Sequence, residues 1–293
     1  MKEASNRARM MTHCGLNRAR GELPLQQLLI ERDGPVALVR FNNPPQGFMN
    51  SATLEDLEAA TLEFDSDDSV RAVVYTGSQP DVFIRHYDTN ELAGMARHMQ
   101  KRGMKFSPER MLPERNIDII FNRIGASTKP HIAAINGACM GGGLEFALAC
   151  DLRYAKAGSY RMGQIEIALG ILPGAGGVAR TAKMIGAAKA MELCLLGDAF
   201  GPAQAAELGL VNELVDGDVV ARAMEVAHRI AGYPPLPVAH IKRIARAAAD
   251  PADPEALALE RTLFMDLMVQ DEAVERLDAY NAGTLAFGDR PAR

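Results

Sequence analysis

The stretch that decides the fold is residues 129–155, KPHIAAINGACMGGGLEFALACDLRYA. Residues 131–136 form an apolar run that ends at a glycine, which predicts a buried strand. A glycine-rich loop follows, and the apolar residues 144–150 predict a buried helix. Residues 151–156 predict a further strand. Short strands that alternate with helices indicate an α/β fold with crossover connections.

The sequence before this stretch opens with a hairpin. Apolar residues 26–31 and 35–41 flank Asp33-Gly34, a dipeptide typical of tight hairpin turns. After a loop at 42–47, Thr53 is positioned to cap a helix. The residues expected to share one face of that helix are Leu54, Leu57, Thr61 and Leu62.

Two further segments matter for a site. Residues 91–115 are charged, rich in methionine and weakly periodic, which favours a mobile helical excursion covering something apolar. Residues 165–172 lead into a second glycine-rich loop at 173–177 that opens a helix. After about residue 217 the chain is expected to be almost wholly helical, with a break at residues 232–235.

We divide the chain into a basic tail at 1–24, a core at 25–216 and a helical C-terminal region at 217–293. The tail is rich in arginine and lacks the apolar stretch of a secretory signal. A flexible tail on a cytoplasmic protein is the preferred interpretation, and an organelle transit peptide is the alternative.

Composition excludes several classes of protein. The 293 residues are 48% hydrophobic and 24% charged, as in ordinary globular domains, and no apolar run reaches the roughly 18 residues of a membrane span. The net charge of −5 disfavours nucleic acid as a partner. The four cysteines form no CxxC pair and no metal-ligand pattern. Three of them, Cys139, Cys150 and Cys194, are expected to be reduced core thiols.

The glycine loops do not fit the nucleotide-binding motifs. Gly137 and Gly142 have the spacing of a phosphate loop, but Gly143 and Leu144 stand where Lys and Ser or Thr are required. One interpretation is that these glycines only permit close packing. The other is that a helix starting at Gly142 or Gly143 points a backbone N–H at a ligand oxygen, as one half of an oxyanion hole.

Two carboxylates stand among apolar residues near these loops. Glu145 lies in the first turn of the predicted buried helix, where it is either a structural cap or a general base. Glu166 is set in the apolar stretch 163–170. Acids in such settings can have pKa values pushed apart, so that one acts as base and the other as acid.

Residues 129–215 strongly resemble the enoyl-CoA hydratase/isomerase (crotonase) superfamily. The matching segments are residues 129–155, the stretch QIEIALGILPGAGGVARTAKMIG at 164–186, and the spacing through residues 195–215. The resemblance extends more loosely over residues 25–285. It implies a spiral of ββα turns with a helical C-terminal oligomerisation region, assembled as a homotrimer or a hexamer.

The resemblance also implies a site. It assigns the oxyanion hole to the N–H groups of Gly142 and Tyr87, and the acid pair to Glu145 and Glu166. Coenzyme A is part of the substrate, and neither a metal nor another cofactor is expected. The substrate-binding positions that it suggests are Phe48, Met49, His86, Asp88, Gly141 and Pro173. For Phe48 and Met49, simple packing in the core is the alternative to contact with CoA.

One loop departs from the family pattern. In residues 83–88, His86 stands where glycine is common and Tyr87 where alanine is common. His86 could be structural, could contact substrate or phosphate, or could act as an acid or base. Hydration of 2-enoyl-CoA to 3-hydroxyacyl-CoA is the leading hypothesis. The alternatives are double-bond isomerisation, CoA-independent hydrolysis of a β-diketone, and a non-catalytic relative that binds CoA or RNA.

Overall fold

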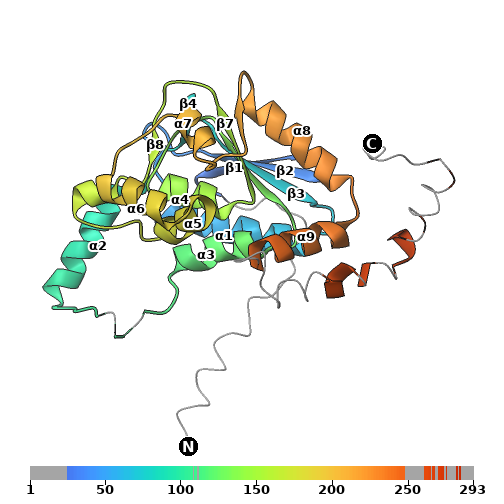
Figure 1. Cartoon of the computed structure of the whole chain (residues 1–293). Coiled ribbons are helices and arrows are strands. Elements are labelled where there is room, and N and C mark those ends of the chain that lie inside the picture. Colours follow the sequence, from blue (N-terminus) through green and yellow to red (C-terminus); the bar gives the residue numbers. More distant parts are fainter. Residues whose placement is uncertain are drawn as a thin grey trace, which may run out of the picture.

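The computed structural model of the chain describes residues 25–247, apart from 108 and 111, and short stretches between 261 and 284. Figure 1 shows the arrangement of these elements. The predicted tail at 1–24 and Cys14 lie outside the described residues. So does much of the predicted helical region after residue 247.

The chain enters the fold through the predicted hairpin. Strands β1 (Leu28–Asp33) and β2 (Val36–Phe41) pair antiparallel across a turn at Gly34. Helix α1 (Ser51–Ser66) follows, but its cap is Asn50 and not the predicted Thr53. The Asn50 side chain accepts a hydrogen bond from the Thr53 backbone N–H at 3.0 Å, while the Thr53 hydroxyl accepts one from the Asn50 N–H at 3.2 Å. Thr53 is therefore the inner partner of a capping box.

A second expectation about α1 is wrong. Leu62 is expected to share a face with Leu54 and Leu57, but it is 51% exposed. The three other residues of that predicted face are buried. The helix presents a narrower apolar face than the sequence suggests, because Leu62 lies beyond its edge.

The strands form two sheets. The larger sheet has the order β1-β2-β3-β5-β7-β9, and the smaller has the order β4-β6-β8. After the first hairpin, the strands of the two sheets that the structure describes pair in parallel. The bounds of the remaining strands are β3 (Ala72–Gly77), β4 (Asp81–Ile84), β5 (His131–Ile135), β6 (Gly137–Met140), β7 (Leu152–Lys156), β8 (Met162–Gly163) and β9 (Glu213–Val215).

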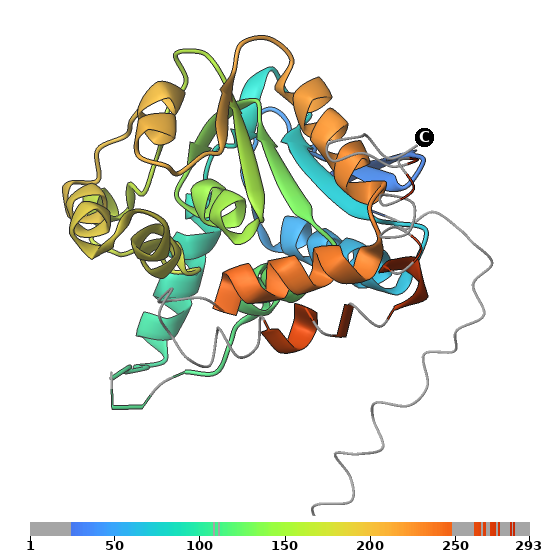
Figure 2. The same cartoon turned by 45° about the vertical axis from the view of Figure 1, so that its right-hand side comes forward.

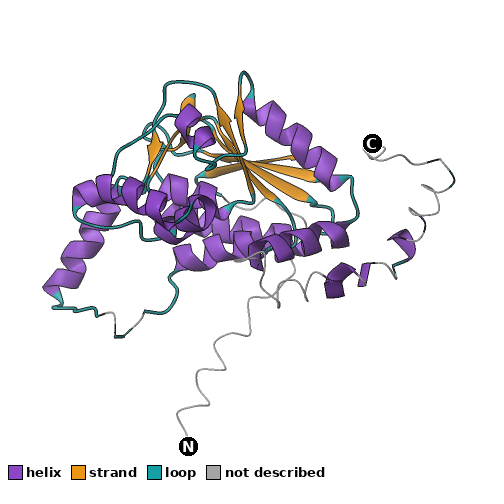
Figure 3. Ribbon diagram, viewed as in Figure 1, coloured by secondary structure: helices purple, strands orange, loops and turns teal. Residues whose placement is uncertain are grey.

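The first turn places β1 and β2 in the larger sheet. From β3 on, successive turns of the chain place one strand in each sheet and then continue into a helix, which produces the predicted spiral (Figure 3). Helix α8 packs on one face of the larger sheet, as Figure 2 shows. The bounds of the helices are α2 (Thr89–Lys101), α3 (Asn116–Ala126), α4 (Gly142–Ala149), the 3-10 helix η1 (Glu166–Leu169), α5 (Gly177–Ile185), α6 (Ala187–Leu196), α7 (Pro202–Glu207), α8 (Val219–Ala231) and α9 (Pro235–Ala247).

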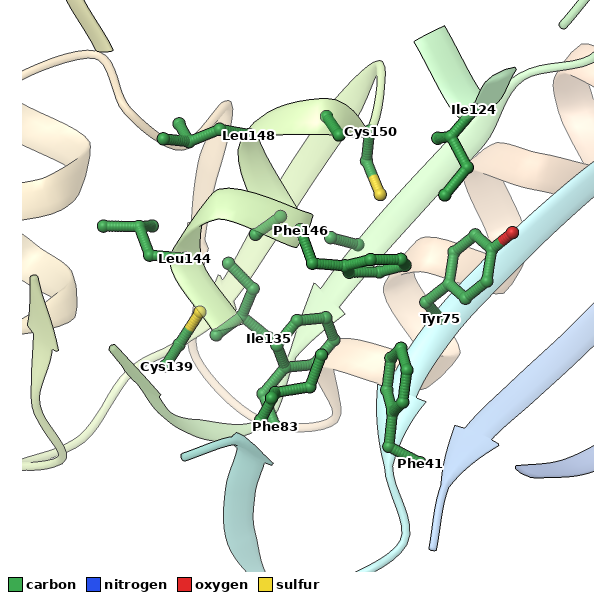
Figure 4. Close-up of a cluster of buried hydrophobic side chains, with 14 of the residues drawn as sticks. Phe41, Tyr75, Phe83, Ile124, Ile135, Cys139, Leu144, Phe146, Leu148 and Cys150 are labelled. Carbon is green, nitrogen blue, oxygen red and sulfur yellow. The ribbon is translucent and has the colours of Figure 1, made fainter. Parts of the chain in front are cut away.

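The core surrounds α4. All eight residues of this helix are buried, as the sequence predicts. The Phe146 ring packs edge-on against Phe41 and Tyr75, with centroids 5.0 Å apart in both pairs (Figure 4). It also packs edge-on against Phe121 at 5.6 Å. Burying an aromatic side chain stabilises a fold by roughly 1.5–3 kcal/mol. The helix that carries Glu145 is therefore fixed by its own neighbours.

The structure confirms the prediction for the cysteines and only part of the prediction for residues 91–115. Cys139, Cys150 and Cys194 are buried free thiols, as predicted. The excursion at 91–115 is a helix only as far as Lys101, and its helix starts two residues earlier than expected. Among the described residues, no helix combines the length and the apolar character needed to cross a bilayer.

Candidate active site

The glycine-rich loop after β6 brings a backbone turn close to a carboxylate. Gly141 has a φ of +49°, a left-handed conformation that side chains other than glycine rarely adopt. A Cβ atom at Gly141 would stand 2.8 Å from the Glu166 carboxylate oxygen, and one at Gly143 would stand 2.1 Å from the carbonyl oxygen of Ile84. The glycines therefore serve both close packing and the approach of the Glu166 carboxylate.

Two backbone N–H groups lie side by side at this loop. Gly142 is the first residue of α4, so its N–H has no acceptor within the helix. Met49 pairs with the Tyr87 segment by donating to the His86 carbonyl at 2.9 Å and accepting from the Asp88 N–H at 2.7 Å. In a parallel bridge of this kind, the central residue is Tyr87, and its N–H points away from Met49.

Gly142 lies close to the same residue, Tyr87. A Cβ atom on Gly142 would be 3.5 Å from the Tyr87 backbone nitrogen. Within the described part of the chain, neither of these two N–H groups has a hydrogen-bond acceptor. The structure thus places the two predicted donors next to each other, with both N–H groups free to bind a ligand oxygen.

Glu145 is buried and firmly held. Its side chain is on α4 and is 4% exposed. Oxygen Oε1 accepts hydrogen bonds from the backbone N–H groups of Ala175 at 2.6 Å and Gly177 at 2.9 Å. Burial raises the pKa of Glu145, while these two amides and the charges of Arg180 and Arg115 act in the opposite direction. The carboxylate is a stronger base than an exposed glutamate and has a fixed orientation.

Glu166 differs from Glu145 in its environment. It is the first residue of η1, and burial raises its pKa to about 7, with the negative charge of Glu145 adding to the effect. Its oxygen Oε2 is buried without a hydrogen-bond partner among the described residues. Glu166 is therefore a weaker acid than an exposed glutamate, and it has one oxygen available to a ligand.

The two acids and the two N–H groups belong to segments that pack around the glycine-rich loop after β6. Glu166 lies against Gly141, which precedes Gly142, and the charge of Glu145 acts on Glu166. The sequence could not establish that these acids approach each other. Two amide donors can hold a carbonyl oxygen that becomes negative, and two nearby acids can add and remove protons. The arrangement suits chemistry at carbons next to a carbonyl group.

The other predicted positions have mixed outcomes. Met49 is completely buried and packs in the core, in agreement with the core-packing interpretation of this residue. The Phe48 ring is partly exposed and stacks on the His86 ring, with centroids 4.5 Å apart. The Asp88 side chain accepts a hydrogen bond from the Asn90 N–H and caps α2. Pro173 is buried beside Gly177.

The unusual loop has local partners for both of its unexpected side chains. Nδ1 of His86 lies 2.7 Å from the Tyr87 carbonyl oxygen. The Tyr87 hydroxyl donates to Glu91 of α2 at 3.0 Å, and Glu91 also accepts from the backbone N–H and the hydroxyl of Ser51. The Tyr87 ring is thereby tied to the beginnings of α1 and α2, while its backbone N–H remains available.

Sequence reasoning missed the groups that hold Glu145. Its amide donors are Ala175 and Gly177, which lie 30 and 32 residues further along the chain. The sequence marks that stretch only as a loop that opens a helix. The guanidinium groups of Arg115 and Arg180 donate to the carbonyl oxygens of Gly174 and Ala175 in that same loop. Arg115 lies in no motif, and Arg180 lies within the matching segment 164–186 without any local signal that marks its contact with this loop. Among the described residues, no group of three His, Cys, Asp or Glu could hold a metal ion.

Comparison with known proteins defines the family. The enoyl-CoA hydratase/isomerase family model matches residues 31–287. The short-chain-enoyl-CoA hydratase of Clostridium acetobutylicum is 30% identical over 260 residues, which are 88% of this chain and 95% of the relative. The 2,3-dehydroadipyl-CoA hydratase of Escherichia coli is 31% identical over 262 residues, 87% of this chain and 96% of that protein.

The solved structures agree with this result. DspI of Pseudomonas aeruginosa superposes with a TM-score of 0.80 at 29% identity, covering 94% of this chain and all of DspI. The chain belongs to the enoyl-CoA hydratase/isomerase family. The predicted crotonase-like α/β fold is confirmed.

Proposed function

We propose that the protein hydrates 2-enoyl-CoA thioesters to 3-hydroxyacyl-CoA. The observation that carries this proposal is the pair of carboxylates beside two unengaged N–H groups. Isomerisation needs a single acid that moves a proton between two carbons. Hydration can use two acids, one that takes a proton from water and one that delivers a proton to the α-carbon. Relatives named as enoyl-CoA hydratases support the same choice.

In the proposed reaction, the thioester oxygen accepts hydrogen bonds from the N–H groups of Gly142 and Tyr87. Water attacks the β-carbon while ionised Glu145 takes its proton. Negative charge then develops on the thioester oxygen, where the two donors stabilise it, and one such donor contributes about 3 kcal/mol. Protonated Glu166 delivers a proton to the α-carbon. The double bond thus gains one hydroxyl and one hydrogen, and the roles reverse in dehydration.

The pKa values support this division of roles. A proton donor works best when its pKa lies near the working pH, as the value of about 7 for Glu166 does. Glu145 accepts two amide hydrogen bonds, which favour its ionised form.

We further propose that the chain works as a homotrimer or a hexamer in the cytoplasm. Large apolar side chains stand exposed along η1 and the turn after it, and along α6. They include Leu169 at 62%, Leu172 at 68%, Leu195 at 67% and Leu196 at 63% exposure. Apolar surface gathered in this way is typical of an interface between subunits. Light scattering on the purified chain would give the number of subunits.

A substrate screen with mass detection tests the reaction. The purified protein is incubated with 2-enoyl-CoA, 3-enoyl-CoA and a CoA-free β-diketone, and products are separated by chromatography. Hydration is expected to add the mass of one water to the 2-enoyl-CoA. A product of unchanged mass with a shifted double bond, or cleavage of the diketone, would contradict the proposal and identify the alternative reaction.

A further inference from the structure

We propose that Arg115 is a positioning residue for Glu145 and acts through the single peptide unit that joins Gly174 to Ala175. This inference rests on the proposed function, because it concerns the base of that reaction. It begins from a peptide bond that is hydrogen-bonded on both sides. The Ala175 N–H donates to Glu145 at 2.6 Å, and the Gly174 carbonyl of the same peptide unit accepts from the Arg115 guanidinium.

The peptide unit therefore stands between a positive group and a negative group. Hydrogen bonds arranged in a chain polarise one another, so the guanidinium strengthens the N–H as a donor to Glu145. It also fixes the plane of the peptide, and with it the direction of the N–H. A carboxylate that must hold an attacking water in one orientation is sensitive to both effects.

Arg115 is itself held in place. It is the cap residue of α3, and its Nε and Nη2 atoms form a two-pronged pair with the Asp118 carboxylate at 2.8 and 2.9 Å. Paired guanidinium and carboxylate groups in this geometry are directional. The chain of contacts thus runs from Asp118 through Arg115 and the peptide to Glu145. These contacts link Arg115, at the end of the segment 91–115, to the buried carboxylate of Glu145.

A second arginine supports the same loop from the other side. Arg180 on α5 donates to the Ala175 carbonyl and to the Asn122 side chain at 2.9 Å. Among the described residues, the titratable groups that act on Glu145 or feel its charge are Glu166 from η1, Cys194 from α6, and the two arginines. Both arginines lower the pKa of Glu145, against the effect of burial. Arg180 stays in place when Arg115 is changed, so the loop should not collapse.

The test compares two arginines on the same segment. Arg115→Gln removes both the positive charge and the two-pronged pairing geometry of the guanidinium, whereas Arg115→Lys keeps the positive charge alone. The matched control is Arg123→Gln, because Arg123 lies on α3 and contacts Thr61 and Glu58, away from the loop. Hydration of crotonyl-CoA is followed from about pH 5 to 9, a range that spans the expected limbs of the profile.

We expect kcat of Arg115→Gln to fall about 10-fold, with KM close to that of the unchanged protein. Its acidic limb should move up by about one pH unit, because removal of a nearby positive charge favours protonated Glu145. Arg115→Lys should keep the acidic limb in place, and Arg123→Gln should match the unchanged protein. An Arg115→Gln enzyme with the kcat and pH profile of Arg123→Gln would overturn the proposal.

A thermal measurement separates this inference from the proposed reaction. Melting temperatures are compared for the unchanged protein, Arg115→Gln, Glu145→Gln and the double variant at neutral pH. The link predicts that Arg115→Gln lowers the melting temperature less in the Glu145→Gln background than in the unchanged one. Equal losses would overturn the link, whatever the protein catalyses. Unequal losses in a protein that hydrates nothing would support the link and contradict the proposed function.

Discussion

Helices α4 and α2 both begin beside the site, and they differ in nearly every physical respect. All eight residues of α4 are buried, and its first N–H and its Glu145 face the site. None of the 13 residues of α2 is buried, and the helix extends away from the sheets (Figure 1). The groups proposed for the chemistry thus stand on the rigid part of the fold. The exposed helix is the part that can vary without disturbing them.

The largest expected effect is on the buried side of this comparison. Glu145→Gln should lower kcat for hydration about 10³-fold, because it removes the proposed base while keeping the side-chain shape. The matched change on the exposed helix is Glu91→Gln, which should leave most of the activity. Steady-state kinetics with crotonyl-CoA gives both values. Similar losses of kcat in the two variants would show that Glu145 on the buried helix matters no more for the reaction than Glu91 on the exposed helix.

The next prediction concerns the first N–H of α4. Gly142→Pro removes that N–H at the first helical position, which is where proline is best tolerated. We expect kcat to fall about 10²-fold through loss of one oxyanion donor. Gly142→Ala is the control, since it adds the same Cβ atom 3.2 Å from the Tyr87 Cβ but keeps the N–H. Equal kcat values for the two variants would argue against a backbone oxyanion hole.

A smaller effect is expected on stability, through Glu166. Its folded-state pKa is about 7, above the ordinary value of 4.5, so the unfolded chain releases this proton at lower pH. Stability should therefore fall as pH rises from about 4.5 to 7, and Glu166→Gln should escape this loss. The melting temperature of the variant should exceed that of the unchanged protein more at about pH 8 than at about pH 5. A constant difference across this range would contradict the raised pKa.

The smallest effect is expected where the site meets α2. Tyr87→Phe deletes the hydroxyl that donates to Glu91 at 3.0 Å but leaves the Tyr87 backbone N–H. We expect kcat with crotonyl-CoA to stay within about threefold, as for other changes at half-exposed contacts. Changes should appear instead in the relative KM values of short and long enoyl thioesters. A loss of kcat as large as that of Gly142→Pro would place the Tyr87 hydroxyl in the chemistry.

The difference between the two helices also explains what sequence could predict. Residues 129–155 were predictable because the apolar run, the glycines and Glu145 lie within one short stretch with strong local signals. The sequence does not identify the N-cap of α1, because Asn50 and Thr53 are both residue types that cap helices. Only the backbone conformation shows which of them precedes the first helical turn. The donors at Ala175 and Gly177 were out of reach because the contact joins segments that are distant in the chain. The pairing of Arg115 with that loop has the same cause.

The proposed addition of water across a double bond is tested most directly with labelled solvent. Crotonyl-CoA is incubated with the unchanged protein, Glu145→Gln and Glu166→Gln in a mixture of H₂¹⁸O and D₂O, and products are analysed by mass spectrometry. The account predicts a 3-hydroxy product that carries ¹⁸O on the β-carbon and deuterium on the α-carbon, formed by the unchanged protein and nearly lost in both variants. A product without ¹⁸O, or full labelling by both variants, would contradict it.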